Sequence, residues 1–513
     1  MPFSFVDLFA GIGGFRIALE SVGGHSIGYS EIAKDAIETY CANFNETKER
    51  NFGDITKLET LPSHDFMVAG VPCQSWSIAG KNLGFDDDRG QLWNDTLYLL
   101  NKVRPKAFIF ENVKGLADPR NKKALNYIMK RIKEAGYHAN KFLLNAYDYG
   151  VPQSRVRIYI IGFKENAYLN RFHITSPQPG QVLLSDVLDD CDISNNHHNG
   201  GNNARCSLSC NAQGFNDYFL FNDLRNGHTT VHTWDIQYTT KRQKDICYLL
   251  LTNRRKSKYG ILDGNAMALA HFKELDPSIQ YEELEELVDM NILKHSPYYY
   301  EICGNTRNLT ESAEFLLSFH NNNILMVDKL RLNKEFRRRK IGIMDTLHQL
   351  ENSGIVKCIE TRYDFKNTKI STGLNGINRI FLPSSKIYPT LVASDTNDFV
   401  STENIEAKSA EEWKEKFMHD IFYTKKYRKI TKSEACKIQG FPHDFILPKA
   451  RAKWMHLIGN SVAVPVVTML AKAVVNTGVF NDANWDGYIP TQAERLIGQI
   501  KEQPTPVQYT LDF

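Results

Sequence analysis

The sequence lacks several features that would assign it to a membrane or secreted class. No apolar run approaches 18 residues, so we expect no membrane span. The start, MPFSFVDLFAG, has no basic region followed by a long apolar core, so we expect no signal peptide. Nine cysteines in 513 residues show no regular spacing, which argues against a disulfide scaffold and suits a reducing cytoplasm. A net charge of +3 permits nucleic acid as a partner without requiring it.

The remaining composition is that of an ordinary globular protein. Hydrophobic residues make up 42% of the chain and charged residues 24%. A chain of 513 residues is long enough for two or more domains with their own cores.

One cysteine stands where chemistry would be expected. In GVPCQSWS (70–77), Cys73 follows the apolar run 66–69, which predicts a buried strand that Gly70 and Pro72 end. Ligands and chemistry gather at the carboxyl ends of strands in open α/β sheets. Cys73 is therefore either a reactive thiol or a small hydrophobic residue in a turn.

A glycine-rich turn near the amino end indicates a nucleoside site. The strand-like run 3–9 leads through Gly11, Gly13 and Gly14 into a helix, which lets backbone N–H groups approach a ligand closely. Glu31 follows Gly11 by about twenty residues, where an acid commonly binds ribose hydroxyls. Asp54 stands at the next strand-like position. The glycine pattern is not GxGxxG, so the turn alone is a weak signal.

Two arginines stand at alternate positions of a third segment. In QSRVR, Arg155 and Arg157 share one face if the segment is a strand. Guanidinium groups suit a base oxygen and a nearby phosphate, and salt bridges to acids such as Glu111 are compatible with that use.

Together these segments resemble the cytosine-C5 DNA methyltransferase family, of the prokaryotic restriction-modification type. The resemblance includes the order of the motifs and covers roughly 1–163 and 386–475. The motifs are DLFAGIGG (7–14), Glu31, GDI (53–55), GVPCQSWS (70–77), GFDDDRGQLW (84–93), FENVKGL (110–116), YGVPQSRVRIYIIG (149–162), RKITKSEACKIQGFP (428–442) and GNSVAVPV (459–466).

The resemblance implies a chemical role for each catalytic candidate. Cys73 would add to carbon 6 of cytosine, which makes carbon 5 enamine-like and able to accept a methyl group. Glu111 would relieve the charge at ring nitrogen 3, which requires a raised pKa. Arg157 would bind the base oxygen and Arg155 would support it. Gln74 and Asn112 complete the predicted catalytic set.

The resemblance also implies S-adenosylmethionine as methyl donor, with S-adenosylhomocysteine as product. Phe9 would touch the adenine, Glu31 the ribose and Asp54 the adenine amino group. Ile32 stands where some relatives carry an aromatic residue, so stacking there is in doubt. The other predicted pocket residues are Gly11, Ile12, Gly13, Gly14, Ile55, Leu92, Asn460 and Val462. We predict no metal, because CSLSC (206–210) lacks a second cysteine pair at ligand spacing.

The fold implied is α/β: a doubly wound mixed sheet of the S-adenosylmethionine-dependent methyltransferase (Rossmann-like) type, with a large inserted α+β target-recognition domain. We expect a catalytic domain at 1–180, the recognition domain at 181–448, a return helix at 449–480 and a tail at 481–513. The insert carries helix–strand patterns, among them Leu284, Leu287 and Val288, that suggest winged-helix-like modules.

Double-stranded DNA is the expected partner, and its target cytosine must be flipped out to reach Cys73. We assign base reading to Asn378 and Arg379, phosphate contacts to basic residues of the insert, and further DNA contacts to Ser75 and Ser77. The basic residues are Arg337, Arg338 and Arg339.

Two other functions remain open: a tRNA cytosine-C5 methyltransferase, which the long insert disfavours, and a catalytically silent DNA-binding homologue. We expect a cytoplasmic monomer, with a cognate restriction or phage-defence nuclease as a candidate partner.

Overall fold

The computed structural model describes residues 3–72, 88–180, 182–189, 231–366, 377, 379–383, 385, 387–405, 407 and 410–481. The chain forms two compact units. The first consists of Met1–Asn203, Phe381–Asn404 and Lys425–Phe513, and the second of Ala204–Ile380 and Ile405–Thr424. The range 181–448, expected to be the recognition domain, therefore overlaps both units.

A six-stranded mixed sheet forms the centre of the first unit. The strand order is β2-β1-β3-β4-β6-β5, with β2, β1, β3 and β4 parallel and β6 antiparallel to both β4 and β5. The chain runs outward from β1 in both directions, so the predicted doubly wound mixed sheet is confirmed. The strands are β1 (Phe3–Leu8), β2 (Gly24–Ser30), β3 (Phe66–Gly70), β4 (Ala107–Val113), β5 (His138–Asn145) and β6 (Val156–Phe163).

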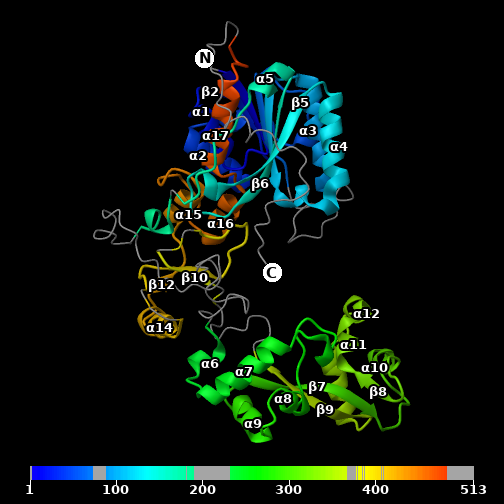
Figure 1. Cartoon of the computed structure of the whole chain (residues 1–513). Coiled ribbons are helices and arrows are strands. Elements are labelled where there is room, and N and C mark those ends of the chain that lie inside the picture. Colours follow the sequence, from blue (N-terminus) through cyan, green and yellow to red (C-terminus); the bar gives the residue numbers. More distant parts are fainter. Residues whose placement is uncertain are drawn as a thin grey trace. The chain divides into compact units, whose positions relative to one another are not determined.

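Helices cover both faces of this sheet (Figure 1). Successive side chains of a strand point to opposite faces. Val6 and Leu8 of β1 accordingly join α3 (Asp88–Val103) and α4 (Lys122–Glu134) in one core cluster. Phe3 and Phe66 contact Phe480 instead, on the side of α1 (Gly14–Glu20) and α17 (Val464–Asn476). This arrangement leaves the carboxyl ends of β1 to β4 at a common edge, where the site lies.

The segment that carries α17 and Phe480 packs against the first helix and strand. The helix α17 packs against α1, and the ring of Phe480 stacks on that of Phe3 with centroids 4.4 Å apart. Within the described residues, one helical stretch, Arg451–Asn476, is long and apolar enough to cross a membrane. Most of its apolar window, 67%, is buried inside the protein, as in the core helix of a globular unit.

The second unit contains a three-stranded antiparallel sheet in the order β8-β7-β9. Its strands are β7 (Leu293–Ile302), β8 (Ile324–Met326) and β9 (Val356–Phe365). Two separate clusters of buried side chains lie along the two long strands. The helices are α6 (Thr233–Ile236), α7 (Lys241–Asn253), α8 (Leu269–Leu275), α9 (Tyr281–Asp289), α10 (Glu311–Leu317), α11 (Val327–Leu332), α12 (Lys334–Arg338), α13 (Ile343–Asn352) and α14 (Ala410–Lys416).

The helical pattern predicted around Leu284 is confirmed. Leu284 and Leu287 are fully buried in α9, and Val288 packs against the same cluster. The other elements of the chain are α2 (Lys34–Phe44), α5 (Asn166–Arg171), α15 (Lys432–Gln439), α16 (Arg451–Asn460), and a small sheet of β10 (Arg379–Phe381), β11 (Asp398–Ser401) and β12 (Tyr427–Arg428).

Candidate active site and cofactor pocket

The glycine turn after β1 has the conformation that its glycines permit. Gly11 and Gly13 adopt φ angles of 55° and 89°, and Phe9 also lies in the left-handed region at 55°. A Cβ on Gly13 would lie 2.2 Å from the ring of Phe44, so no larger residue fits there. A Cβ on Gly11 would meet nothing within 4 Å. The turn thus has open space beside Gly11, as a bound ligand requires.

Glu31 ties this turn to the end of β2. Its carboxylate accepts hydrogen bonds from the backbone N–H groups of Gly11 at 2.9 Å, Ile32 at 2.7 Å and Ala33 at 2.8 Å. The side chain of Ile32 is 73% exposed, unusual for a large aliphatic residue. An aliphatic surface next to a fixed carboxylate suits a nucleoside, with the sugar hydroxyls on the acid and the ring on Ile32.

Asp54 presents a second acceptor at the same edge. Its side chain accepts hydrogen bonds from the backbone N–H and the hydroxyl of Thr56, at 3.0 and 2.8 Å. These bonds lower the pKa of Asp54, so the group is ionised at neutral pH. Ile55 is buried, and a Cβ on Gly53 would meet nothing within 4 Å. The acceptor therefore also adjoins open space.

The return segment supplies the remaining predicted pocket residues. Val462 lies against the turn, because a Cβ on Gly14 would be 2.8 Å from its Cγ2 atom. Asn460 ends α16 with an exposed side chain whose amide lies 3.2 Å from the ring of His456. Leu92 of α3 packs against the core under β1, β3 and β4. Residues separated by hundreds of positions thus meet at one sheet edge.

Glu111 and Arg157 form a buried ion pair at the ends of β4 and β6. The Arg157 Nε atom lies 3.1 Å from a Glu111 carboxylate oxygen. Burial raises the pKa of Glu111, and the charges of Arg157 and Arg155 oppose that rise. In the parallel pairing of β3 with β4, Glu111 is the partner of Gly70, three residues before Cys73. A carboxyl group that is more easily protonated than usual therefore lies beside the strand that leads to the cysteine.

Arg155 faces the backbone of the return segment. It is 3% exposed and donates hydrogen bonds to the carbonyls of Leu391 at 2.9 Å, Gly459 at 3.0 Å and Ser461 at 2.6 Å. The two arginines of QSRVR thus have different surroundings: Arg157 faces an acid, whereas Arg155 holds the chain that carries Asn460 and Val462.

Asn112 holds the approach to the cysteine loop. Its side-chain amide donates to the carbonyl of Val71 at 3.1 Å, and its oxygen accepts from the N–H of Val113 at 2.8 Å. The residue is 1% exposed. It therefore fixes the backbone two residues before Cys73.

Sequence reasoning missed Asp7. This residue is fully buried in β1, and neither carboxylate oxygen has a hydrogen-bond partner within the described part of the chain. Burial raises its pKa well above the ordinary value, and the nearby charge of Glu31 adds to the effect. A carboxylate inside the apolar run FSFVDLF was the available signal.

Five predicted site residues lie outside the described part of the chain: Cys73, Gln74, Ser75, Ser77 and Asn378. Arg379 begins β10. Arg337, Arg338 and Arg339 are exposed at the end of α12 in the second unit. Of the described residues, none gather as three His, Cys, Asp or Glu side chains able to hold a metal ion.

Comparison with known proteins matches nearly the whole chain to one family. The family model for C-5 cytosine-specific DNA methylases matches residues 3–476. The Type II methyltransferase M.HgiBI of Herpetosiphon aurantiacus is 37% identical over 483 residues, covering 92% of this chain and 96% of that protein.

Two further relatives differ in how much of the chain they match. The Type II methyltransferase M.NlaIV of Neisseria lactamica is 28% identical over 502 residues, covering 92% of this chain and 99% of its own. The Type II methyltransferase M.HhaI of Haemophilus parahaemolyticus is 41% identical over 186 residues, covering 36% of this chain and 56% of its own. The mixed sheet, the site at its edge and these matches together show the family. The chain belongs to the C-5 cytosine-specific DNA methylase family and is an S-adenosylmethionine-dependent enzyme that methylates carbon 5 of cytosine in DNA.

Proposed function

We propose that the chain methylates cytosine within one specific double-stranded sequence, through a covalent bond between Cys73 and the base. The observation that carries the proposal is the buried Glu111–Arg157 pair, 3.1 Å apart, next to the strand that runs into Cys73. A nucleophile, an acid and a cation at one sheet edge are what addition to a cytosine ring needs.

The chemistry divides a difficult step into easier ones. The thiolate of Cys73 forms a bond with carbon 6, and the electron pair of the ring double bond becomes available at carbon 5. Glu111, with its raised pKa, gives a proton or a hydrogen bond to nitrogen 3, which limits the negative charge on the ring. Carbon 5 would take the methyl group as its bond to the donor's sulfur breaks, which releases S-adenosylhomocysteine. A base such as water would then take the proton of carbon 5, the carbon 6–sulfur bond would break to regenerate the thiolate, and nitrogen 3 would return any proton it received to Glu111. Arg157 would hold the base oxygen.

The pocket beside Gly11 would hold the methyl donor. S-adenosylmethionine supplies a methyl group on a positively charged sulfur. Glu31 would accept hydrogen bonds from the ribose hydroxyls and Asp54 from the adenine amino group, while Ile32 and Phe9 would cover the ring. The open space at Gly11 and Gly53 and the exposed apolar surface of Ile32 support this assignment. Asn460 and Val462 would close the pocket from the return segment, which Arg155 holds in place.

The duplex would be bound with the target cytosine flipped out of the stack, since Cys73 cannot reach a paired base. We propose that Ser75, Ser77, Asn378 and Arg379 contact the DNA around that cytosine. Because the catalytic groups meet only the flipped base, the neighbouring sequence would be read by the insert.

The relatives' names support a biological setting. Those that match most of this chain are called Type II methyltransferases. We propose that this protein is likewise the modification enzyme of a restriction-modification system, acting as a cytoplasmic monomer with a cognate nuclease.

The test is methyl transfer from labelled S-adenosylmethionine to duplex DNA and to tRNA. The parent protein should label DNA and form a trapped adduct with a duplex containing 5-fluorocytosine. Cys73→Ser should do neither but should still bind both substrates. Cys303→Ser, at an exposed cysteine of the second unit, is the matched control and should behave as the parent. Turnover by Cys73→Ser, or labelling of tRNA in place of DNA, would contradict the proposal.

A further inference from the structure

The second unit contains two modules that repeat one another, each made of several helices followed by a long strand. The first module consists of α7, α8, α9 and the start of β7, and the second of α10, α11, α12, α13 and the start of β9. Leu284 and Leu287 of α9 correspond to Leu347 and Leu350 of α13, each pair 63 positions apart, and all four are buried. The two helices therefore bury the same face.

The turns after these helices repeat at the same spacing. Asn291 and Gly354 both have positive φ angles, of 58° and 67°. The N–H of Ile292 donates to the carbonyl of Leu287 at 3.0 Å, and the N–H of Ile355 donates to that of Leu350 at 2.9 Å. The strands β7 and β9 begin at the next residue in each module.

The two long strands pair symmetrically. The beginning of each lies opposite the end of the other. For the three outermost pairs at each end, shifting one residue forward and the other back by 63 positions gives a second observed pair, and register shifts between Pro297 and Tyr300 interrupt this rule in the middle. The register pairs are Leu293 with Phe365, Lys294 with Asp364, Glu301 with Lys357 and Ile302 with Val356.

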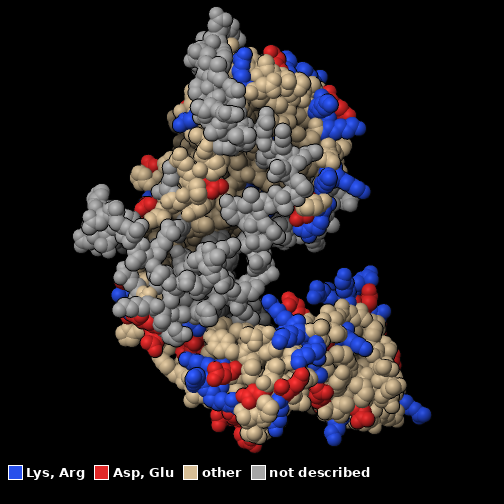
Figure 2. Space-filling model, in the orientation of Figure 1, with Lys and Arg blue, Asp and Glu red and all other residues tan. Residues whose placement is uncertain are grey.

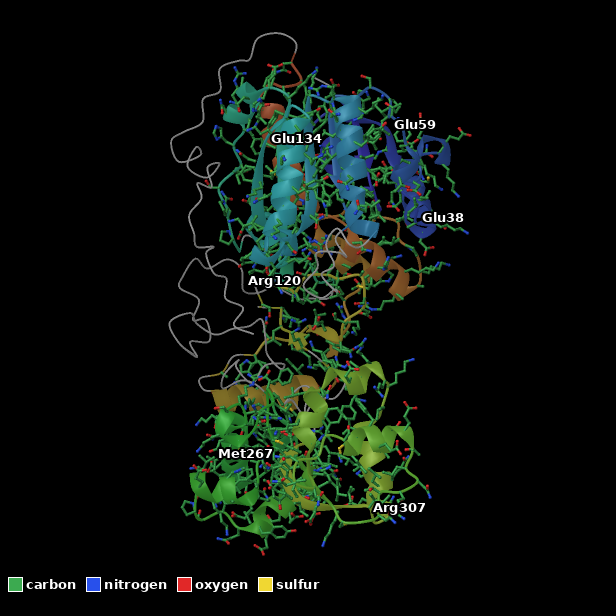
Figure 3. All side chains as sticks on the ribbon, turned by 90° about the vertical axis from the view of Figure 1, so that its right-hand side faces the viewer. Glu38, Glu59, Arg120, Glu134, Met267 and Arg307 are labelled. Carbon is green, nitrogen blue, oxygen red and sulfur yellow. The ribbon has the colours of Figure 1, made fainter. Side chains whose placement is uncertain are left out.

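Each module also has a short segment that pairs with the long strand of the other module, at a different spacing: Met267 and Leu325 are 58 positions apart, whereas their partners are 63 apart. Met267, labelled in Figure 3, is buried and pairs with Tyr363, and Leu325 of β8 pairs with Tyr300. The sheet of each module is thus completed by the far half of the other module's long strand. Such symmetry in register, turns and core indicates a duplicated module whose third strands are exchanged.

Against this common framework, the outward faces of α9 and α13 carry different chemistry. Four positions on α9 away from its buried leucines are all carboxylates, of which Glu285 is half-buried and accepts a hydrogen bond from Tyr363, whereas the equivalent positions on α13 are one carboxylate, one histidine and two amides. The pairs are Glu282 with Asp345, Glu285 with His348, Glu286 with Gln349 and Asp289 with Asn352.

The helices and turns that precede α9 and α13 also differ in charge, with the first module more acidic and the second more basic. Residues 269–289 carry seven carboxylates and one lysine, whereas the equivalent 332–352 carry five Lys and Arg side chains and three carboxylates. In Figure 2, blue side chains gather over α12 and red ones near α9. Arg339 packs over the ring of Phe315 at 4.1 Å, which anchors one of these cations beside the turn.

We propose that the second module docks on duplex DNA through α12 and α13, and that the first module, its acidic copy, stays off the DNA. The proposal rests on DNA being the substrate. In a helix-turn-helix, the second helix enters the major groove and amide side chains read base edges there. His348, Gln349 and Asn352 have that position on α13. Arg337, Arg338, Arg339 and Lys340, at the turn before it, bind the phosphates.

The experiment uses the full chain and a duplex that carries the methylated sequence, once that sequence is found by methylation sequencing. The triple variant Arg337→Gln/Arg338→Gln/Arg339→Gln should bind DNA with a weaker salt dependence. The negative slope of log affinity against log salt concentration should become shallower by about two to three, because about 0.9 of a counterion is released for each phosphate contact. His348→Ala/Gln349→Ala should lose at least about 5- to 150-fold in affinity, the range for a single base contact. These side chains are exposed, so folding should persist, which circular dichroism checks.

The matched control is Glu282→Gln/Glu286→Gln, at the equivalent exposed face of α9. It should bind DNA as the parent does or more tightly. Equal losses from the α9 and α13 variants, or second-module variants with the parent's affinity and salt slope, would overturn the proposal and leave α12 as a surface for another acidic partner. Labelled methyl transfer separates this from the proposed function: a parent protein that methylates no DNA contradicts the function, whereas an active parent with unaffected variants contradicts only the docking surface.

Discussion

Arg155 gives the most direct test of how the site is held together. The side chain is buried and its guanidinium donates to three backbone carbonyls, those of Leu391, Gly459 and Ser461. Arg155→Ala would remove the donors and leave the buried carbonyls of Leu391 and Gly459 without them, whereas the part-buried carbonyl of Ser461 would keep its hydrogen bond from Gln439. A hydrogen bond to a charged group contributes about 1.5–3 kcal/mol, and bonds that share one group do not add. A buried carbonyl left without a donor costs about 1–3 kcal/mol, so we expect a total loss of about 2–5 kcal/mol.

Such a loss is a large fraction of the roughly 5–15 kcal/mol that stabilises a domain. Urea unfolding followed by tryptophan fluorescence measures it, since Trp93 and Trp454 are buried in the first unit. The affinity for S-adenosylmethionine should fall as well, because Asn460 and Val462 lie on the segment that Arg155 holds.

Arg120→Ala is the control. Arg120, labelled in Figure 3, pairs with Asp118 at the surface, and its side chain is 64% exposed. Water screens an exposed pair such as this one, so it adds little to stability and the variant should unfold nearly as the parent does. If the unfolding curve of Arg155→Ala matched that of the parent, the three hydrogen bonds would not hold the return segment and the reasoning would fail.

Two further predictions concern the pocket. Glu31→Ala and Asp54→Ala should each weaken S-adenosylmethionine binding by about 1–3 kcal/mol, the cost of losing hydrogen bonds to a charged group. Calorimetry measures the affinity, and an unchanged affinity in both variants would show that the cofactor binds elsewhere. Asp7→Asn should stabilise the protein increasingly as pH rises above 3.8, because burial raises the pKa of Asp7 and the folded protein retains a proton that the unfolded chain releases above that ordinary value. Urea unfolding at pH 5 and pH 8 checks this; the same change in stability at both pH values would show that Asp7 does not titrate abnormally.

Much of the first unit could be predicted because its signals are local. The apolar run 66–69 bounded by Gly70 and Pro72, and the glycine turn after β1, each specify a strand end by short-range geometry. Parallel strands bring such ends to one edge, so the position of Glu31 and Glu111 there follows from strand order, whereas Asp54 belongs to no strand and lies in the connection before β3.

The roles of Arg155 and Asp7 could not be obtained in this way, because they depend on contacts between distant segments. Arg155 and Arg157 differ by two positions, and alternation alone predicts the same surroundings for both. Their surroundings differ only because the backbone of Leu391, Gly459 and Ser461 packs against the side chain of Arg155, just before β6. The repeat in the second unit escaped notice for a related reason, since it is carried by spacing and register more than by identical residues.

The stacking of Phe480 on Phe3 has a consequence for how the protein is made. The two rings are 4.4 Å apart in the folded first unit, yet they leave the ribosome at opposite ends of synthesis. At about 5–20 residues per second, Phe3 waits roughly half a minute to a minute and a half for Phe480 to appear. The second unit, whose described residues fall within 231–424, is complete before Phe480 is made and is then free to fold. The inserted unit is thus expected to be native before the unit that flanks it in sequence, and α17, the last helix of the described residues, packs against the part of the chain that was made first.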